Sequence, residues 1–457
     1  MEGGLSMAVW NIVNRTDFRS HANIMAEHYQ LERIRAEEYL KSISTYRIKD
    51  LYKEVIQIIS PSKLEDSWNV YDLTDGISNF LTTEPHYTKS SSAKKVAVEN
   101  DFVISRLRSY LKEMAVVPNC NYKMAFSTEY LVYRSKQSIT ASLLLPFSLS
   151  SYVQSILKWA QMGNEHPRFS SETFGDIFIP NCILAHSNEI SAYIAEAIEC
   201  QKQSQALYHQ AETLIAKELQ LDQLKLPNKK WYTADYYEAV KSKRLDSTHF
   251  RDAYSDLFDF LKNHFLCKKI GQIVSLNRRG LQPIYSRKGT IMVVNSKHLS
   301  ATHILYDQTE RTTEEEFSKQ SVAQIKYGDV LIYTTGAYIG LTNAFNSQEK
   351  ALASNHVNIL RLSDTSIDPN YLALVMNSKI GKLQTEKHSR GSAQLELYPA
   401  DIAKFVIPII SENKMKEIGD LVRNSLSALN QSKQLLAQAK RRVEELIEQE
   451  ANKYKQT

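Results

Sequence analysis

Asp329-Val330-Leu331-Ile332 is a short apolar run behind an acidic residue, and Asp101-Phe102-Val103-Ile104 has the same form earlier in the chain, at an offset of 228. Runs of this kind predict buried β-strands. Further along each stretch, residues 127–134 and 354–361 form a second pair of strand-like runs, each closed by an arginine, at an offset of 227. The chain therefore contains two similar β-rich blocks.

The correspondence continues in the same order beyond these strands. Gly163 falls opposite Gly391, and Ile177–Pro180 falls opposite Phe405–Pro408, again at an offset of 228. Several matches in one order at nearly constant spacing are the mark of an internal repeat. We therefore predict that the chain arose by duplication.

A helical segment with heptad spacing follows each block. Each heptad has two positions that face a partner helix. One of them mostly holds a large apolar residue and the other a small residue, so two such helices can approach closely. A pseudo-twofold axis between the copies then predicts an antiparallel pair. The alternative is that each helix packs only on its own domain. The predicted packing positions are Ile194, Ala197, Tyr208, Ala211, Ile215, Val422, Leu429, Leu436 and Val443.

The charge of the chain is only mildly basic, at +5 over 457 residues. This total is well short of what non-specific coating of nucleic acid uses. Its distribution is uneven, because residues 268–298 contain seven basic residues and no acidic ones. We interpret this acid-free segment as a candidate phosphate-facing surface.

The four cysteines are scattered, without CxxC pairs or histidines at metal-ligand spacing. The N-terminal residues lack the pattern of a signal peptide, and no stretch approaches the ~20 apolar residues of a membrane span. We expect a reduced, cytoplasmic protein without a metal site.

Taken together, these residues resemble the specificity subunits of type I restriction-modification systems. The likeness rests on Gly328–Ile332 followed by Thr335–Gly340, then on Gly391–Leu395 running into Phe405–Pro408 and the heptad helix. It covers nearly the whole chain, in the order recognition domain, helix, recognition domain, helix. The first copy lacks the Gly-rich turn of the second.

The resemblance implies an α+β fold with two β-rich target-recognition domains. They are related by the internal repeat and separated by long α-helices that form an antiparallel coiled-coil pair. The expected parts are a first recognition domain at 1–186, a first spacer helix at 187–225, a second recognition domain at 226–410 and a second helix at 411–457. Each recognition domain would grip the major groove of DNA.

The partners that the resemblance implies are double-stranded DNA and two modification (methyltransferase) subunits, with restriction (helicase-nuclease) subunits joining that core. No membrane is expected. Two basic β-rich globules on a rigid spacer are built to contact a duplex at two places. We therefore expect a bipartite DNA target whose unread spacer is set by the helices.

Catalytic motifs are missing from the sequence. No Pro-Pro pair exists to build the (D/N)PP(Y/F) tetrad of an adenine methyltransferase, and no GxxxxGK[ST] phosphate loop exists. Glu412 and Lys414 resemble the tail of a nuclease carboxylate set, but glutamate is favoured where a helix begins. We expect no catalytic residue and no cofactor in this chain, and place S-adenosylmethionine, ATP and magnesium in partner subunits.

Base reading requires polar side chains on exposed loops, and thymine methyls are met by aromatic or threonine side chains. Candidates follow the first strand of each repeat, lie near the Gly163 and Gly391 turns, or belong to the loops before them. The predicted DNA-binding residues are Arg106, Arg108, Lys112, Lys94, His166, Arg168, Arg278, Arg279, Arg287, Lys288, Thr334, Thr335, Tyr338, Arg390 and Gln394.

Three other interpretations stay open at this point. The chain could serve another methylation-based phage-defence system that uses such a subunit. It could be a coiled-coil scaffold without a DNA role, or an enzyme whose motifs have drifted. The scaffold hypothesis does not account for the acid-free segment or for the duplicated globules.

Overall fold

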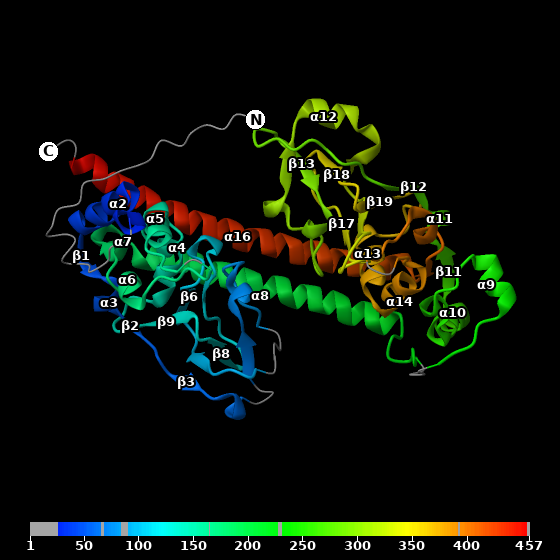
Figure 1. Ribbon diagram of the computed structural model, residues 1–457, viewed down its shortest axis with the longest axis horizontal. Helices are drawn as coiled ribbons and strands as arrows, with labels where there is room; N and C mark the ends of the chain where they lie inside the picture. The colour runs from blue at the N-terminus through cyan, green and yellow to red at the C-terminus, as the bar shows by residue number, and fades with distance from the viewer. Residues whose placement is uncertain are drawn as a thin grey trace. The chain divides into compact units, whose positions relative to one another are not determined.

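The computed structural model (Figure 1) forms two compact units. Unit 1 comprises Met1–Gln205 with Ala428–Thr457, and unit 2 comprises Ala206–Ser427. Two long helices, α8 (Ser187–Glu218) and α16 (Glu412–Tyr454), contribute residues to both units. The residues that the structure describes are 26–64, 68–83, 90–163, 165–226, 231–391 and 394–454.

Unit 1 contains the first copy of the repeat. Its shorter helices are α2 (Leu31–Ser42), α3 (Ile48–Leu51), α4 (Leu144–Ser148), α5 (Ser151–Trp159), α6 (Ser171–Gly175) and α7 (Asn181–Ala185). Its strands are β1 (Ser44–Arg47), β2 (Tyr52–Glu54), β3 (Ile58–Ile59), β4 (Trp68–Tyr71), β5 (Lys94–Ala97), β6 (Phe102–Ser105), β7 (Met114–Val116), β8 (Lys123–Ser127), β9 (Tyr130–Ser135) and β10 (Phe178–Pro180).

Unit 2 contains the second copy. Its shorter helices are α9 (Tyr236–Ser242), α10 (Asp252–His264), α11 (Ile270–Ile273), α12 (Glu314–Lys319), α13 (Pro369–Asn377), α14 (Lys379–His388) and α15 (Pro399–Ile402). Its strands are β11 (Leu266–Lys269), β12 (Val274–Arg279), β13 (Ile291–Val294), β14 (Glu310–Thr312), β15 (Gln324–Ile325), β16 (Val330–Tyr333), β17 (Thr342–Ala344), β18 (Ala351–Ala353), β19 (Val357–Leu362) and β20 (Val406–Ile409).

One four-stranded antiparallel sheet has the same topology in both units. Its strand order is β2-β9-β6-β7 in unit 1 and β12-β19-β16-β17 in unit 2. The two predicted strands at 101–104 and 329–332 are β6 and β16, and both are buried throughout their apolar residues. The two copies of the sequence repeat thus fold into the same four-stranded sheet.

A second four-stranded sheet is shared only in part. Its orders are β3-β5-β8-β4 in unit 1 and β14-β13-β18-β15 in unit 2. Three strands correspond, with one parallel pair in each unit, β4 with β8 and β13 with β18. The fourth strand lies at opposite edges of the sheet in the two units. In unit 1 it is β3, which pairs with β5, and in unit 2 it is β14, which pairs with β13. The copies have diverged at the edge of this sheet.

A buried ion pair joins two neighbouring strands at the same place in each copy. Asp101 and Asp329 are each 1% exposed and accept two hydrogen bonds from an arginine of the adjacent strand. The Arg134 Nε and Nη2 atoms each lie 2.7 Å from an Asp101 oxygen, and those of Arg361 lie 2.8 and 2.7 Å from Asp329. This pair explains why the sequence has an acidic residue before one run and an arginine at the end of the next.

The long helices run antiparallel within unit 1. Arg442 Nε on α16 lies 2.9 Å from Glu189 Oε1 on α8, and Ser432 Oγ donates to the Ala197 carbonyl oxygen at 2.7 Å. Ser432 and Ala197 are fully buried. A small residue on each helix therefore allows the backbones to approach, as the heptad pattern predicts.

In unit 2 the end of α8 meets the start of α16, where Lys414 Nζ lies 3.9 Å from Glu218 Oε1. The predicted packing positions are buried in both units except Leu429, which is half-buried. The buried positions also belong to the apolar cores of their units. Each helix thus packs on its own unit as well as on the other helix. Among the described residues, no helix is long and apolar enough to cross a membrane.

We predict that Ser432→Leu destabilises the chain, because a leucine side chain does not fit where Ser432 contacts the Ala197 carbonyl. Overpacking of a close contact costs about 1–3 kcal/mol. The measurement is urea unfolding of the purified chain. The control is Gln434→Leu, at an exposed position of the same helix, which should leave the unfolding midpoint nearly unchanged. Equal effects of the two substitutions would contradict the close helix contact.

Candidate nucleic-acid interface

In unit 1 an irregular turn follows β6 directly and spans residues 106–112. It contains the 3-10 helix η4 (Ser109–Leu111), and the residues on either side of η4 have left-handed backbone conformations. Their φ angles are 50° at Arg108 and 53° at Lys112. Two long basic side chains therefore occupy positions that favour glycine.

The corresponding turn of unit 2 spans residues 334–340 after β16. Gly336 and Gly340, with φ angles of 114° and 92°, match Arg108 and Lys112 at the repeat offset of 228. The first copy thus keeps positive φ angles at the positions of the Gly-rich turn while lacking its glycines. A non-glycine residue in this region costs about 1–3 kcal/mol, and such strain is concentrated at functional sites. We interpret Arg108 and Lys112 as residues retained for their side chains.

An exposed tyrosine lies within each turn. Tyr110 is 66% exposed and Tyr338 is 67% exposed, and the same offset of 228 relates them. Sequence reasoning predicted Tyr338 but missed Tyr110, although the constant offset identifies it. A large aromatic side chain left exposed at the same place in both copies is available to contact a base or a sugar.

A second loop packs beside the turn of unit 1. Arg168 forms β-bridges with Leu107 and with Met162. The Arg108 N–H also donates to the Pro167 carbonyl oxygen at 3.0 Å. The predicted residues Arg106, Arg108 and Arg168 are thereby brought together from two loops that are far apart in the sequence.

Unit 2 repeats this arrangement. Glu396 forms β-bridges with Thr335 and with Arg390, and all three residues match their counterparts in unit 1 at the offset of 228. Gly163 and Gly391 also correspond, with φ angles of 96° and 106°. The same two loops therefore meet in both copies, while the side chains that they carry differ.

Glu129 links two of the predicted arginines. Arg106 donates from Nε to Glu129 Oε2 at 2.9 Å, while Arg168 donates from Nε and Nη2 to both carboxylate oxygens at 3.0 and 2.9 Å. The hydrogen bond from Arg168, with that from Arg106, lowers the pKa of Glu129 below its ordinary value against the opposing effect of burial. Sequence reasoning missed Glu129, because no spacing connects it to either arginine.

Arg279 in unit 2 is held against the second loop rather than left free. Its Nη2 atom donates to the Leu397 carbonyl oxygen at 3.0 Å, its guanidinium lies 4.8 Å from the ring centre of Tyr398, and Glu396 lies 3.6 Å away. Its neighbour Arg278 is half-buried as well. Arg279 therefore positions the loop.

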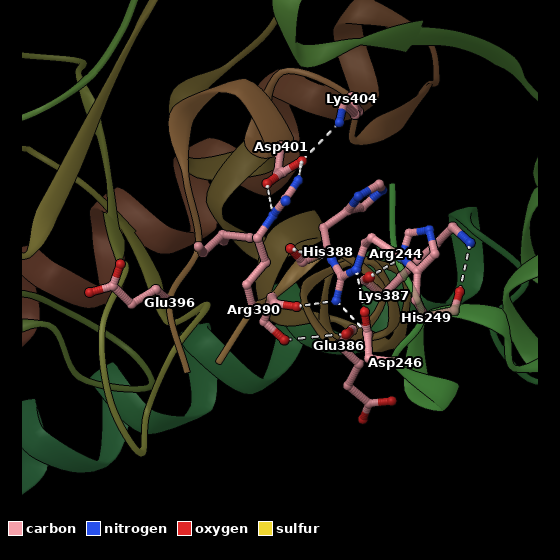
Figure 2. A network of polar contacts seen from close by, with 12 residues as sticks. Arg244, Asp246, His249, Glu386, Lys387, His388, Arg390, Glu396, Asp401 and Lys404 are labelled. Atoms are coloured by element: carbon pink, nitrogen blue, oxygen red, sulfur yellow. Dashed lines mark hydrogen bonds and ion pairs between the residues drawn. The ribbon is translucent and has the colours of Figure 1, made fainter. Parts of the chain in front are cut away.

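Figure 2 shows the hydrogen bonds that hold the residues just before Gly391 to the rest of unit 2. The Arg390 Nε and Nη2 atoms donate to Asp401 at 2.9 and 3.1 Å, and Lys404 Nζ donates to the same carboxylate at 2.8 Å. Arg244 donates to the Ser389 carbonyl oxygen at 2.7 Å. Arg390, predicted as a DNA contact, thus has much of its guanidinium engaged within the unit.

Three predicted DNA contacts are buried instead. Thr334, Thr335 and Lys94 are 0%, 6% and 6% exposed. The Thr334 hydroxyl donates to the His356 carbonyl oxygen at 2.9 Å, because the chain still follows the sheet there, and Lys94 lies on β5 with its Nζ 2.9 Å from Asp72. Buried side chains do not reach DNA, so we withdraw the interpretation of these three as contacts.

The acid-free segment 268–298 is not one continuous basic surface. Lys268, Arg279 and Lys297 each form an ion pair with a carboxylate from elsewhere in unit 2. Arg287 and Lys288 are exposed. The other exposed residues of the predicted set, outside this segment, are Lys112, His166, Tyr338, Arg390 and Gln394.

In the part of the chain that the structure describes, no cluster of three or more His, Cys, Asp or Glu side chains is arranged to hold a metal ion. The candidate interface consists of cationic, aromatic and amide side chains on the two turns and on the loops beside them. Such side chains form hydrogen bonds with base edges and phosphates.

Comparison with known proteins finds a family model that matches part of the chain. Residues 266–441 match the model of the type I restriction modification DNA specificity domain. No curated protein matches the sequence. The fold search finds the S subunit of a type I restriction-modification system from M. genitalium, with 11% identity and a TM-score of 0.44, covering 88% of this chain and 94% of that one. It also finds the HsdS subunit from Thermoanaerobacter tengcongensis, with 15% identity, a TM-score of 0.28 and the same coverage.

The family match confirms the resemblance seen in the sequence. It covers the second copy of the repeat from β11 into α16, and the first copy repeats the central sheet and both loops of that region. The second copy of the repeat therefore carries a DNA specificity domain of the type I restriction-modification class.

We predict that Arg108→Gly and Lys112→Gly each stabilise the chain by about 1 kcal/mol, because glycine relieves the left-handed strain. The same variants should bind target DNA more weakly, since a cationic side chain is lost. Urea unfolding and duplex binding by the purified chain measure the two effects.

Asn100→Gly is the matched control. Asn100 also has a positive φ, 66°, and stands where unit 2 has Gly328. Asparagine tolerates this conformation, so stability and DNA binding should both change little. Glycine variants at 108 and 112 that lost stability, or that bound DNA as tightly as the wild type, would contradict the functional interpretation of the turn.

Proposed function

We propose that the two units read the two halves of a bipartite DNA target, one half each, through the turns 106–112 and 334–340. The observation that carries this proposal is the equivalence of Tyr110 and Tyr338, two exposed rings at one position of a duplicated backbone. Duplicated reading surfaces suit a target with two separate recognised parts. The side chains around each tyrosine differ, so the two halves would have different sequences.

The turn chemistry supports contact with DNA. In unit 1 the tyrosine is surrounded in sequence by Arg106, Arg108 and Lys112, and in unit 2 Gln394 is exposed on the adjoining loop. Arginine and lysine recognise guanine, glutamine recognises adenine, and all of them also bind phosphates. A scaffold without a DNA role would gain nothing from the strain at Arg108 and Lys112.

We further propose that the chain positions two modification (methyltransferase) subunits on the DNA, and that restriction subunits join the same complex. The antiparallel parts of α8 and α16 are the elements that the family resemblance associates with these partners. The sequence lacks both the methyltransferase tetrad and the phosphate loop. S-adenosylmethionine, ATP and magnesium would accordingly be held by the partner subunits.

We predict that Tyr110→Ala and Tyr338→Ala each impair recognition of a different half of the target. A lost base contact costs about 1–3 kcal/mol, so each variant should relax the sequence requirement in one half and leave the other unchanged. The measurement is the map of methylated bases in host DNA when each variant is expressed with its modification subunit. If both variants altered the same half, the assignment of one half to each unit would be wrong.

A further inference from the structure

We propose that the half-site read by unit 1 contains a G·C pair, that Arg106 recognises its guanine in the major groove, and that Glu129 is a positioning residue for Arg106. This inference rests on the proposed function, because it names the base that one of the two units reads. It is carried by the contacts of a single guanidinium group.

Arg106 is held at its backbone and at Nε while the end of its side chain stays available. Its N–H donates to the Glu129 carbonyl oxygen and its own carbonyl oxygen accepts from Phe169, both at 3.1 Å. Its Nε donates to the Glu129 carboxylate at 2.9 Å. Within the described residues its two Nη groups make no hydrogen bond, and the side chain is 39% exposed.

Glu129 is itself fixed by Arg168. Arg168 uses its Nε and Nη2 on the two Glu129 oxygens and donates from Nη1 to the His166 carbonyl oxygen at 3.0 Å. Arg168 therefore acts as a clamp on the carboxylate. The carboxylate in turn orients Arg106, which loses less conformational freedom when it binds a ligand.

The free end of Arg106 selects for guanine by its chemistry. Two parallel N–H groups on the Nη atoms match two adjacent acceptors, and guanine N7 and O6 are the only such pair that a base presents in the major groove. Adenine presents one acceptor beside a donor. The neighbouring positive charges of Arg108 and Lys112 add attraction for the phosphates on either side.

The equivalent positions of unit 2 lack this arrangement. Arg106 corresponds to the buried Thr334, Arg168 to Glu396, and Glu129 to His356 at the local offset of 227. Among the described residues, these three counterparts do not form an arginine oriented through its Nε by a carboxylate, although Arg279 lies 3.6 Å from Glu396. The guanine contact proposed for Arg106 therefore has no counterpart at the same position of unit 2.

The test begins with the methylated target of the wild-type complex, in which Tyr110→Ala identifies the half read by unit 1. Binding of the complex of this chain with its modification subunit is then measured on duplexes in which each G·C pair of that half is replaced by A·T. One replacement should weaken wild-type binding by about 5- to 150-fold, the equivalent of 1–3 kcal/mol.

The chain with Arg106→Ala should bind the G·C and A·T duplexes equally, and Glu129→Gln should reduce the preference while retaining most of the binding to the other positions. Arg35→Ala removes an exposed arginine of α2 in the same unit and should keep the full preference. Loss of preference without loss of binding elsewhere is a result that general misfolding does not produce.

Two results would overturn the inference. In the first, the half read by unit 1 contains no G·C pair. In the second, Arg106→Ala weakens binding to all duplexes equally and makes the salt dependence of binding shallower, which identifies a phosphate contact. Failure of Tyr110→Ala and Tyr338→Ala to separate the target into two halves would instead refute the proposed function. The two failures are therefore distinguishable.

Discussion

A buried aspartate before the central strand of each copy determines where the recognition turn leaves the sheet. Asp101 accepts two hydrogen bonds from Arg134 on β9 and one from the Val98 N–H at 2.9 Å. Asp329 makes the same contacts with Arg361 and with the Lys326 N–H at 2.7 Å.

Loss of the arginine would leave a buried aspartate charge uncompensated, which is strongly destabilising. The arginines themselves are 35% and 28% exposed. The pairing register of β6 with β9, and of β16 with β19, is therefore strongly specified. A slip of one residue would turn every side chain of the strand to the opposite face. The turns that follow the two strands thus begin from the same geometry, and their side chains are free to diverge.

Under the proposed function, the unit 1 turn is less stable than the unit 2 turn because it carries side chains that contact DNA. Gly336 and Gly340 occupy their positive φ angles without strain, whereas Arg108 and Lys112 occupy equivalent positions at a cost. A rigid sheet with a buried ion pair can support this local strain, since the turn contributes little to the core. Functional residues commonly reduce stability in this way.

The sequence was sufficient for the parts of the structure that repeat along the chain. The apolar runs at β6 and β16 and the heptads of α8 and α16 are local patterns, and a constant offset connects them. Contacts between distant loops could not be predicted from the sequence. Neither the hydrogen bonds from Arg168 to Glu129 nor the burial of Thr334 leaves a pattern in the neighbouring residues. Lys94 was predicted on an exposed loop, whereas that residue begins a buried strand.

Transplanting one turn into the other copy tests most directly whether the two copies are equivalent readers. In the chain to be tested, residues 106–112 are replaced by the sequence of residues 334–340, which restores glycine at both positive-φ positions. The methylated bases of host DNA are mapped for this chain and for the wild type, each expressed with its modification subunit. We expect one half of the target to change while the other half and the spacing stay the same. An unchanged target, or a change in both halves, would contradict the account.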